Sequence, residues 1–290
     1  MSLLVPGTPT DPLVVVRSRL WQFNGIGLWS GDEAVVIDPG IDPDEIAELS
    51  ERVRTAERDG EPRRVVTVVL THSHHDHIRG WSRFPGARVV MPRVAAEKGE
   101  VARERILAAK HKIDQHLAVS DPGFAYPEAD EVFDERLRLT CGELELELRF
   151  LPGHSNCTSV VWIPALKTLC TADYLVSPGL PYCRWEATAF DQALAEMLRW
   201  TDELGVERVV PAHRDLHVGA EAVRAALSRE REYMQVLRTQ VRAALADGRS
   251  PDEAARHAAR AMGQWRAEDV GRRDRQDLDN AQRVVAEEAA

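Results

Sequence analysis

The residues best suited to chemistry are four histidines and one aspartate within six positions of each other: His72, His74, His75, Asp76 and His77. Imidazole and carboxylate are zinc ligands, and a catalytic zinc ion takes about three of them together with a water. On an extended loop, His72 and His74 point to one side and can hold one ion, while Asp76 and His77 face a second. On a helix they would diverge. The spacing predicts a metal site; the alternative is an exposed tract that binds metal incidentally.

The segments on either side of these ligands must hold them in place. The apolar run Val65–Leu70 precedes them and is typical of a strand buried on both faces of a sheet. A helix is predicted near 78–84. It would place Asp76 and His77 close to a helix N-terminus, where a carboxylate is favoured. The ligands are therefore expected on a loop that leaves the end of a rigid strand.

Three later motifs also follow apolar stretches, and they contribute His154, Asp173 and His213 in that order. His-x-His-x-Asp-His after a strand, followed by these three residues, resembles the metallo-β-lactamase superfamily over roughly residues 13–217. The resemblance implies that one ion is held by His72, His74 and His154, and the other by Asp76, His77 and His213. Asp173 would bridge the two ions. His75 is not a ligand in this scheme and is expected to be exposed or to lie behind the ligands.

The resemblance also implies a mechanism. Two zinc ions, or iron or manganese in their place, would share a water that becomes hydroxide near neutral pH and attacks a carbonyl or phosphoryl centre. Asp76 and Asp173 would then be the catalytic carboxylates. Asp38, after the strand predicted at 33–37, either orients a ligand from behind, like the buried aspartate of that family, or is a turn residue.

Two motifs depart from the family pattern, at three positions in all. The last motif is commonly Pro-Gly-His-Gly, whereas this chain has an alanine before His213 and Arg214 after it. Glycine commonly precedes the bridging aspartate, and here Ala172 does. Neither change removes a ligand, but both are expected to reshape the mouth of the site.

Periodicity and turn signals predict a mixed α/β chain. Strands are expected at 14–20, 21–28, 33–37, 65–70, 87–91, 136–140, 144–151, 158–163, 168–172 and 208–210, and helices at 43–58, 97–115, 188–204, 221–246, from 251, and at 268–289. A capping box is expected at Thr188–Asp191 and a cap at Ser250. The resemblance implies a four-layer αβ/βα sandwich. The predicted domains are residues 1–217 and a C-terminal helical region, 218–290, which packs as an appendage, forms a small accessory domain or makes a homodimer.

Segment 94–135 interrupts the regular alternation and carries a basic stretch at 98–112. One hypothesis is a lid whose Lys110 and Lys112 bind an anionic substrate; the alternative is a solvated helix and a linker. After Asp173, a loop carries Tyr174, Tyr182 and Arg184, which are further candidates for substrate contact. Either tyrosine could donate to a substrate carbonyl or be packed in the core.

The loop after Asp173 is distantly similar to that of the hydroxyacylglutathione hydrolases, or glyoxalase II group. The first hypothesis is therefore a hydrolase of a small acyl substrate, a thioester or an ester. The alternatives are a lactonase, a phosphodiesterase or nuclease, and an oxidoreductase with a single iron, similar to the persulfide dioxygenases.

Composition narrows the range of partners. The chain has 290 residues and a net charge of −10, which argues against broad nucleic-acid affinity. It has neither a long apolar span nor a signal-peptide pattern, so a cytoplasmic location without membrane contact is predicted. The four cysteines form no close motif and are expected to be free thiols.

Overall fold

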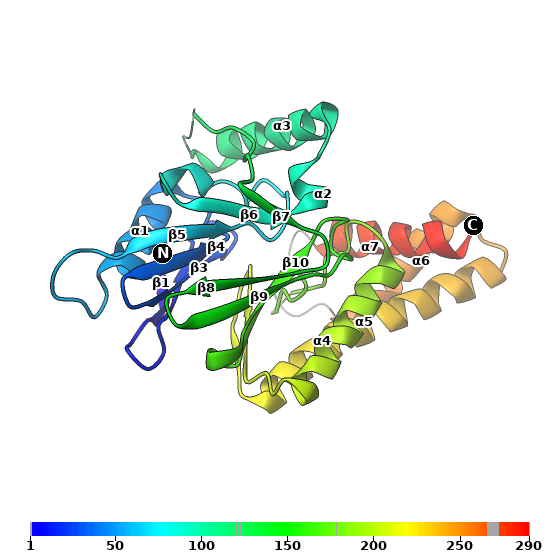
Figure 1. Ribbon diagram of the computed structural model, residues 1–290. Coiled ribbons are helices and arrows are strands. Elements are labelled where there is room, and N and C mark those ends of the chain that lie inside the picture. Colours follow the sequence, from blue (N-terminus) through cyan, green and yellow to red (C-terminus); the bar gives the residue numbers. More distant parts are fainter. Residues whose placement is uncertain (1, 120, 122, 178, 266–272, 290) are drawn as a thin grey trace. The chain divides into compact units, whose positions relative to one another are not determined.

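The computed structural model describes residues 2–119, 121, 123–177, 179–265 and 273–289 (Figure 1). The fold is mixed α/β, with two β-sheets and a run of C-terminal helices, as the sequence predicts. The chain divides into two compact units. Unit 1 comprises Met1–Phe150 and Cys157–Leu166, and unit 2 comprises Leu151–Asn156 and Lys167–Ala290. The predicted domain boundary at 217 stays a prediction.

A seven-stranded sheet forms the framework of unit 1, and its strands lie side by side in sequence order. The strands are β1 (Ser2–Pro6), β2 (Leu13–Arg17), β3 (Asn24–Ser30), β4 (Glu33–Ile37), β5 (Arg64–Val69), β6 (Arg88–Pro92) and β7 (Glu131–Phe133). The first four are antiparallel, and β4 to β7 are parallel. The carboxyl ends of β4 and β5 therefore meet at one edge, where Asp38 and the histidine motif emerge.

Helix α1 (Pro43–Thr55) covers one face of this sheet. Asp42 caps it by accepting a hydrogen bond from the Asp44 amide, and proline stands at its first turn. Its buried face packs so closely that a Cβ added at Gly27 would lie 2.3 Å from a Val53 methyl carbon. Strands β8 (Arg136–Cys141), β9 (Leu144–Phe150) and β10 (Ser159–Ile163) form an antiparallel meander in the same unit.

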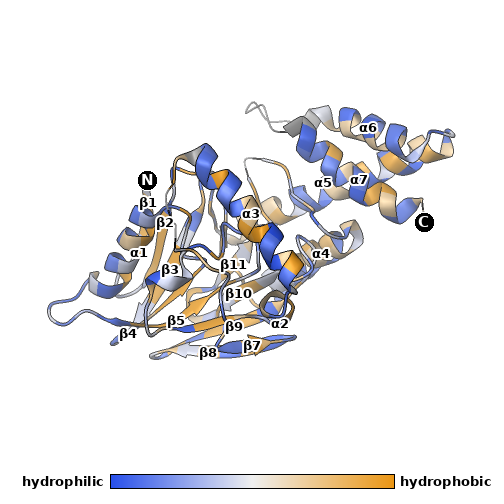
Figure 2. Cartoon of the chain, turned by 90° about the horizontal axis from the view of Figure 1, so that it is seen from above, coloured by the Kyte–Doolittle hydropathy of each residue, from blue (hydrophilic) through white to orange (hydrophobic). Residues whose placement is uncertain are grey.

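Segment 94–135 contains the short helix α2 (Arg93–Ala96) and helix α3 (Glu100–Leu117). Figure 2 shows hydrophilic and hydrophobic bands along α3. The chain after α3 returns to the unit 1 core through Phe124 and Tyr126, which pack in the same buried cluster as Ile78. The Tyr126 hydroxyl donates to the Ala95 carbonyl oxygen, 2.6 Å away. These contacts tie the segment to unit 1 at its C-terminal end.

The environment of Lys110 differs from the one expected for a cation that binds substrate. Its side chain is fully buried, and its ammonium group lies 2.8 Å from the Asp114 carboxylate and 2.9 Å from the Asp121 carbonyl oxygen. The helical period explains the difference, because residues four apart on α3 bring Lys110 and Asp114 together. Lys112 is exposed on the same helix and remains a candidate for substrate contact.

Unit 2 contains parallel strands β11 (Thr168–Ala172) and β12 (Arg208–Pro211), with the short antiparallel strand β13 (His217–Val218) beside β12. Its helices are α4 (Ala187–Glu203), α5 (Ala220–Ala246), α6 (Pro251–Ala261) and α7 (Arg273–Glu288). The 3₁₀ turns of the chain are η1 (Trp81–Arg83), η2 (Pro164–Leu166) and η3 (Met262–Trp265). The predicted cap at Ser250 is present as a complete capping box with Glu253.

The predicted capping box at Thr188 is wrong. Helix α4 begins after Glu186, which makes no side-chain cap. The Thr188 hydroxyl instead donates to the Glu287 carboxylate of α7, 2.6 Å away. Glu287 is in turn bound by Arg238 of α5. Thr188 thus joins α4 to α7, and this tertiary contact outweighs its local preference for a capping position.

Helices α4 to α7 pack on one another within unit 2, and α5, α6 and α7 lie side by side in Figure 1. Buried polar contacts fix α7: the Tyr233 hydroxyl of α5 donates to Asp277, 2.6 Å away, and the Asn280 amide donates to the Tyr233 oxygen. Within the described part of the chain, every helix is too short or too polar to cross a bilayer.

Candidate metal centre

The histidine motif lies on a turn at the end of β5. The expected helix near 78–84 is absent: the Ile78 amide donates to the His74 carbonyl oxygen in a single turn, and only the 3₁₀ turn η1 follows. The segment Phe84-Pro85-Gly86 ends any helical continuation. Asp76 and His77 are buried without the support of a helix N-terminus, so the helix-dipole argument does not apply to them.

Asp38 fixes the motif from behind. Its carboxylate accepts hydrogen bonds from the Thr71 amide (2.8 Å) and hydroxyl (2.6 Å) and lies 2.8 Å from Nδ1 of His77. A histidine that donates its Nδ1 proton to a carboxylate keeps the Nε2 lone pair for a metal. Asp38 itself has a left-handed backbone, with φ of 44°. This geometry favours the orienting role over that of a simple turn residue.

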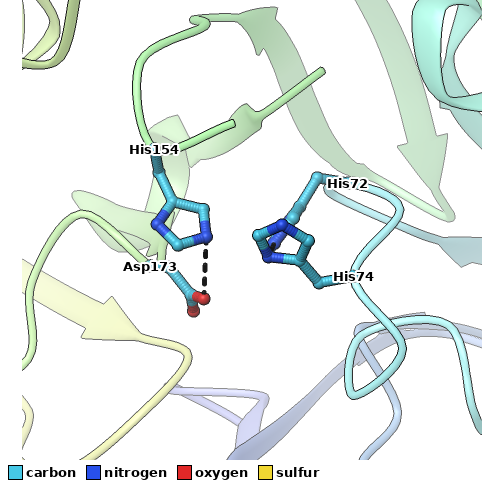
Figure 3. Close-up of side chains that lie close together, drawn as sticks. All are labelled: His72, His74, His154 and Asp173. Carbon is cyan, nitrogen blue, oxygen red and sulfur yellow. Dashed lines mark hydrogen bonds and ion pairs between the residues drawn. The ribbon is translucent and has the colours of Figure 1, made fainter. Parts of the chain in front are cut away.

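His72 and His74 direct ring nitrogens at one another, as the i, i+2 argument expects. Nε2 of His72 lies 2.9 Å from Nδ1 of His74, and Figure 3 shows the two rings in contact at this point. The Thr71 hydroxyl lies 3.1 Å from the other ring nitrogen of His72. Two imidazole nitrogens that converge in this way present lone pairs to one location, which is the arrangement two ligands of a shared ion require.

Unit 2 brings its three candidate ligands together around Asp173. Parallel strands end at the same edge of a sheet, so Asp173 after β11 and His213 after β12 are neighbours. One Asp173 oxygen lies 3.1 Å from Nε2 of His154, an ion pair drawn as a dashed line in Figure 3. The other oxygen lies 3.6 Å from Nε2 of His213. The carboxylate therefore presents a separate oxygen to each histidine, as a bridging ligand would.

The ring of His154 is held by a main-chain carbonyl. Its Nδ1 donates to the Tyr182 carbonyl oxygen over 2.6 Å, which leaves Nε2 to face Asp173. Its neighbour Gly153 has no room for a side chain, since an added Cβ would lie 2.7 Å from the Tyr174 hydroxyl oxygen and 2.8 Å from the Phe190 Cα. Glycine is therefore required before His154 for the close approach of α4.

The family model of the metallo-beta-lactamase superfamily matches residues 26–213, which is more than half of the chain and includes every candidate ligand. The chain belongs to the metallo-β-lactamase superfamily. A comparison with curated proteins gives no match. The histidine and aspartate side chains described above are of types that can hold divalent metal ions, in keeping with this family.

Solved structures support the fold. A metallo-beta-lactamase from Pontibacter korlensis is 20% identical, with a TM-score of 0.59 over 81% of this chain and 99% of that one. The stereoselective inverting sec-alkylsulfatase Pisa1 from Pseudomonas sp. is 19% identical, with a TM-score of 0.68 over 97% of this chain and 50% of that one. A metallo-beta-lactamase family protein from Thermus thermophilus is 17% identical, with a TM-score of 0.64 over 95% and 94%. At these identities the likeness concerns the fold alone.

Two of the three departures from the superfamily pattern share a left-handed backbone. Ala172 has φ of 48° and Arg214 has φ of 70°, so both stand where glycine would be unstrained. A left-handed conformation costs a residue with a Cβ roughly 1–2 kcal/mol. The chain therefore keeps the backbone that positions Asp173 and His213 although it lacks glycine at either place.

The predicted substrate residues have different environments. Tyr174 is fully buried, and its hydroxyl donates to the Leu151 carbonyl oxygen and accepts from the His154 amide, so it supports His154 rather than facing a ligand. Tyr182 is half-buried and Arg184 is exposed. His75 is half-buried and makes an edge contact with the Trp21 ring; burial lowers its pKa.

Sequence reasoning missed the groups that hold the ligands. The Tyr182 carbonyl, the Thr71 hydroxyl and the α7 contacts to segment 180–184 carry no motif of their own. Thr71 could have been found, because a hydroxyl residue directly before the first ligand of a strand-end motif is well placed to contact both Asp38 and the His72 ring. A main-chain carbonyl, by contrast, leaves no signal in the residue type.

A buried carboxyl in α5 gives unit 2 a pH-dependent stability. Glu230 is 2% exposed, and one of its oxygens has no hydrogen-bond partner among the described residues. Burial raises the pKa of Glu230 from 4.5 to about 8, against smaller opposite effects of Arg229 and the Val176 backbone. Between pH 4.5 and about 8, Glu230 therefore keeps its proton in the folded state and loses it in the unfolded state.

We expect the free energy of unfolding to fall as the pH rises from about 5 to 8, with a slope contribution of up to about 1.4 kcal/mol per pH unit from this group. Glu230→Gln should remove that contribution and stabilise the protein by up to about 4 kcal/mol at pH 8, and by less than about 1 kcal/mol at pH 5. Urea unfolding at both pH values measures this. Glu232→Gln, at an exposed position nearby, is the control, and equal pH slopes in wild type and Glu230→Gln would contradict the prediction.

Proposed function

We propose that this protein is a metal-dependent hydrolase that binds two metal ions, most simply zinc, and cleaves a small acyl substrate, a thioester or an ester. In the proposed site His72, His74, His154 and Asp173 hold one ion, and Asp76, His77 and His213 hold the other, with Asp173 shared. The observation that carries the proposal is the position of Asp173, whose two carboxylate oxygens are offered to different histidines.

The donor set fits such ions. All of these side chains are histidines or aspartates, and imidazole with carboxylate suits zinc, iron and manganese. The four cysteines are free and buried, and none of them belongs to either group of candidate ligands among the described residues. The proton-bearing nitrogens of His77 and His154 are occupied by Asp38 and by the Tyr182 carbonyl. The remaining nitrogen of each ring is then the one that can bind a metal, as this chemistry requires.

Metal ions in this site would supply a Lewis acid for the substrate oxygen and lower the pKa of a water toward neutrality. The protein's own part is to keep the ligands rigid, through Asp38 and Thr71 in unit 1 and through Gly153 and the Tyr182 carbonyl in unit 2. With these groups the reaction needs no serine or cysteine nucleophile.

The substrate class rests on charge and on the loop after Asp173. The acidic chain disfavours a polyanionic polymer, while Arg184 and the exposed Lys112 supply isolated cations for a small acid. The cation of Lys110, by contrast, is balanced within the protein. A small acyl substrate that carries an acidic group agrees with this pattern better than a neutral lactone does.

Two measurements test the proposal. Protein purified without chelator should contain close to two equivalents of transition metal by elemental analysis. It should hydrolyse at least one acyl thioester in a panel that includes lactones, a sulfate ester and bis-p-nitrophenyl phosphate, and lose that activity when the metal is removed. A single iron with no second ion would favour an oxidoreductase, and phosphodiester turnover with silent thioesters would overturn the assignment.

A further inference from the structure

A cavity of about 270 Å³ lies in unit 2 between segment 180–184 and helix α7. It is lined by Tyr182, Cys183, Arg184, Asp279, Gln282 and Arg283. Its volume is close to the lower end of the range for small-molecule sites. All of its lining residues belong to one unit, which also holds His154 and Asp173.

The cavity carries net positive charge in an acidic chain. Among its lining residues Arg184 and Arg283 are cationic and only Asp279 is anionic, whereas the whole chain has a net charge of −10. In the described part of the molecule, neither guanidinium has a carboxylate within ion-pair distance. This differs from Arg231, Arg238 and Arg242 of the same unit, which are each paired with an acid.

Arg184 is held in an ordered position without being neutralised. Its guanidinium carbon lies 4.9 Å above the centre of the Tyr182 ring, and its Nη1 donates to the Tyr182 hydroxyl oxygen over 3.0 Å. That hydroxyl donates to Asp279, 3.3 Å away, so the one carboxylate of the cavity is occupied by a neutral donor. The guanidinium keeps donors free for a ligand.

The cavity is connected to the candidate metal ligands through the backbone of the same segment. The Tyr182 carbonyl oxygen accepts from His154, the Arg184 amide donates to the His154 carbonyl oxygen (2.9 Å), and the Tyr182 and His154 ring centres are 6.4 Å apart. The side chain of Tyr182, which lines the cavity, is therefore a direct neighbour of the His154 ring.

Helix α7 fixes the segment that forms the cavity. The buried Asn280 side chain accepts from the Cys183 amide (3.0 Å) and donates to the Pro181 carbonyl oxygen (2.7 Å), and Gln276 donates to the Leu180 carbonyl oxygen (2.8 Å). The C-terminal region thus has a role beyond packing, because one of its helices forms a wall of the cavity and holds the other wall.

We propose that this cavity is the specificity subsite of the enzyme and binds the carboxylate of an acidic acyl substrate between Arg184 and Arg283, with α7 as one wall. The inference rests on the proposed function. It specifies in addition that the substrate carries an acidic group and that Arg283 of α7 helps to select it. Two planar guanidinium groups suit a carboxylate because each can donate two parallel hydrogen bonds to it.

A binding experiment tests the subsite without turnover. Calorimetric titration of the metal-loaded protein with 3-(methylthio)propionate, which cannot be hydrolysed, is compared with titration of its uncharged amide. We expect the acid to bind at least about tenfold more tightly, because each arginine contact contributes about this factor. Arg184→Ala and Arg283→Ala should each remove most of the difference. Arg260→Ala, at an exposed position on α6 outside the cavity, should keep it.

A kinetic arm uses 3-(acetylthio)propionate and 3-(acetylthio)propanamide, which differ only in charge. The ratio of their kcat/KM values should fall about tenfold in Arg283→Ala through KM, and a merely structural defect would lower both values alike. Equal binding of acid and amide by the wild type, or an unchanged ratio in Arg283→Ala, would overturn the subsite. If no thioester is cleaved but the acid still binds through Arg283, the proposed function fails and the subsite stands.

Discussion

Replacing Asp173 by alanine is expected to reduce turnover at least about a thousandfold and to lower the bound metal while the fold is retained. Removal of one well-placed electrostatic group in an active site costs roughly 10²–10³ in rate, and Asp173 would be lost as a ligand to both ions. Its oxygens lie 3.1 and 3.6 Å from Nε2 of His154 and His213. Without it, these two rings lose the only carboxylate that the structure shows between them among its described residues.

The fold should survive because Asp173 follows β11 rather than filling the apolar core. Circular dichroism and the urea midpoint therefore report on structure, while elemental analysis and kcat report on the site. Asp173→Asn tests charge at constant size and should bind metal more weakly than wild type. Asp252→Ala, an exposed aspartate at the start of α6, is the matched control. Full activity in Asp173→Ala would remove this residue from the site.

The sequence allowed the ligand-bearing framework to be predicted because each ligand follows a run of apolar residues, and such runs become strands. Val65–Leu70 becomes β5 almost residue for residue, and Glu33–Ile37 is β4 as predicted. Strand ends are local features, since a buried strand stops where polar and turn residues begin. The order of the motifs then identified the family before any contact was known.

The errors share a different origin: each concerns a residue whose partner is distant in sequence. Thr188 has the local pattern of a capping box, yet its partner is Glu287. The motif after β5 was expected to continue as a helix, but the turn is fixed instead by Asp38, which comes from a neighbouring strand. Local propensity cannot anticipate such contacts, because tertiary packing decides them.

The same reason explains why the support of His154 was not predicted. Its ring is held by the carbonyl of Tyr182, and Tyr182 lies in a segment that Asn280 holds from α7. Each step joins residues far apart in the chain, and the first uses a main-chain atom. The C-terminal helices accordingly left no functional signal in the sequence, although the structure links them to a candidate ligand.

Lys110→Ala is expected to destabilise the protein by about 3 kcal/mol, because it would remove a buried cation that two carboxylates share. The ammonium group is fully buried, 2.8 Å from Asp114 and 3.6 Å from Asp121, and it lies 4.7 Å from the centre of the Phe124 ring. Arg79 also pairs with Asp114, and Arg83 pairs with Asp121, so each carboxylate would keep one arginine partner. Asp121 would lose the buried cation that faces it.

Urea unfolding followed by tryptophan fluorescence measures this effect, and Lys112→Ala is the matched control. Lys112 is exposed two residues further along α3, so its loss should change stability by less than about 0.5 kcal/mol. The two variants also distinguish a substrate-binding role of the basic stretch 98–112 from a structural one. A substrate cation at 110 would raise KM in Lys110→Ala at unchanged stability, whereas a structural cation lowers the unfolding midpoint and leaves KM of the remaining folded protein near the wild-type value. The burial and the three oxygen contacts of Lys110 favour the structural outcome.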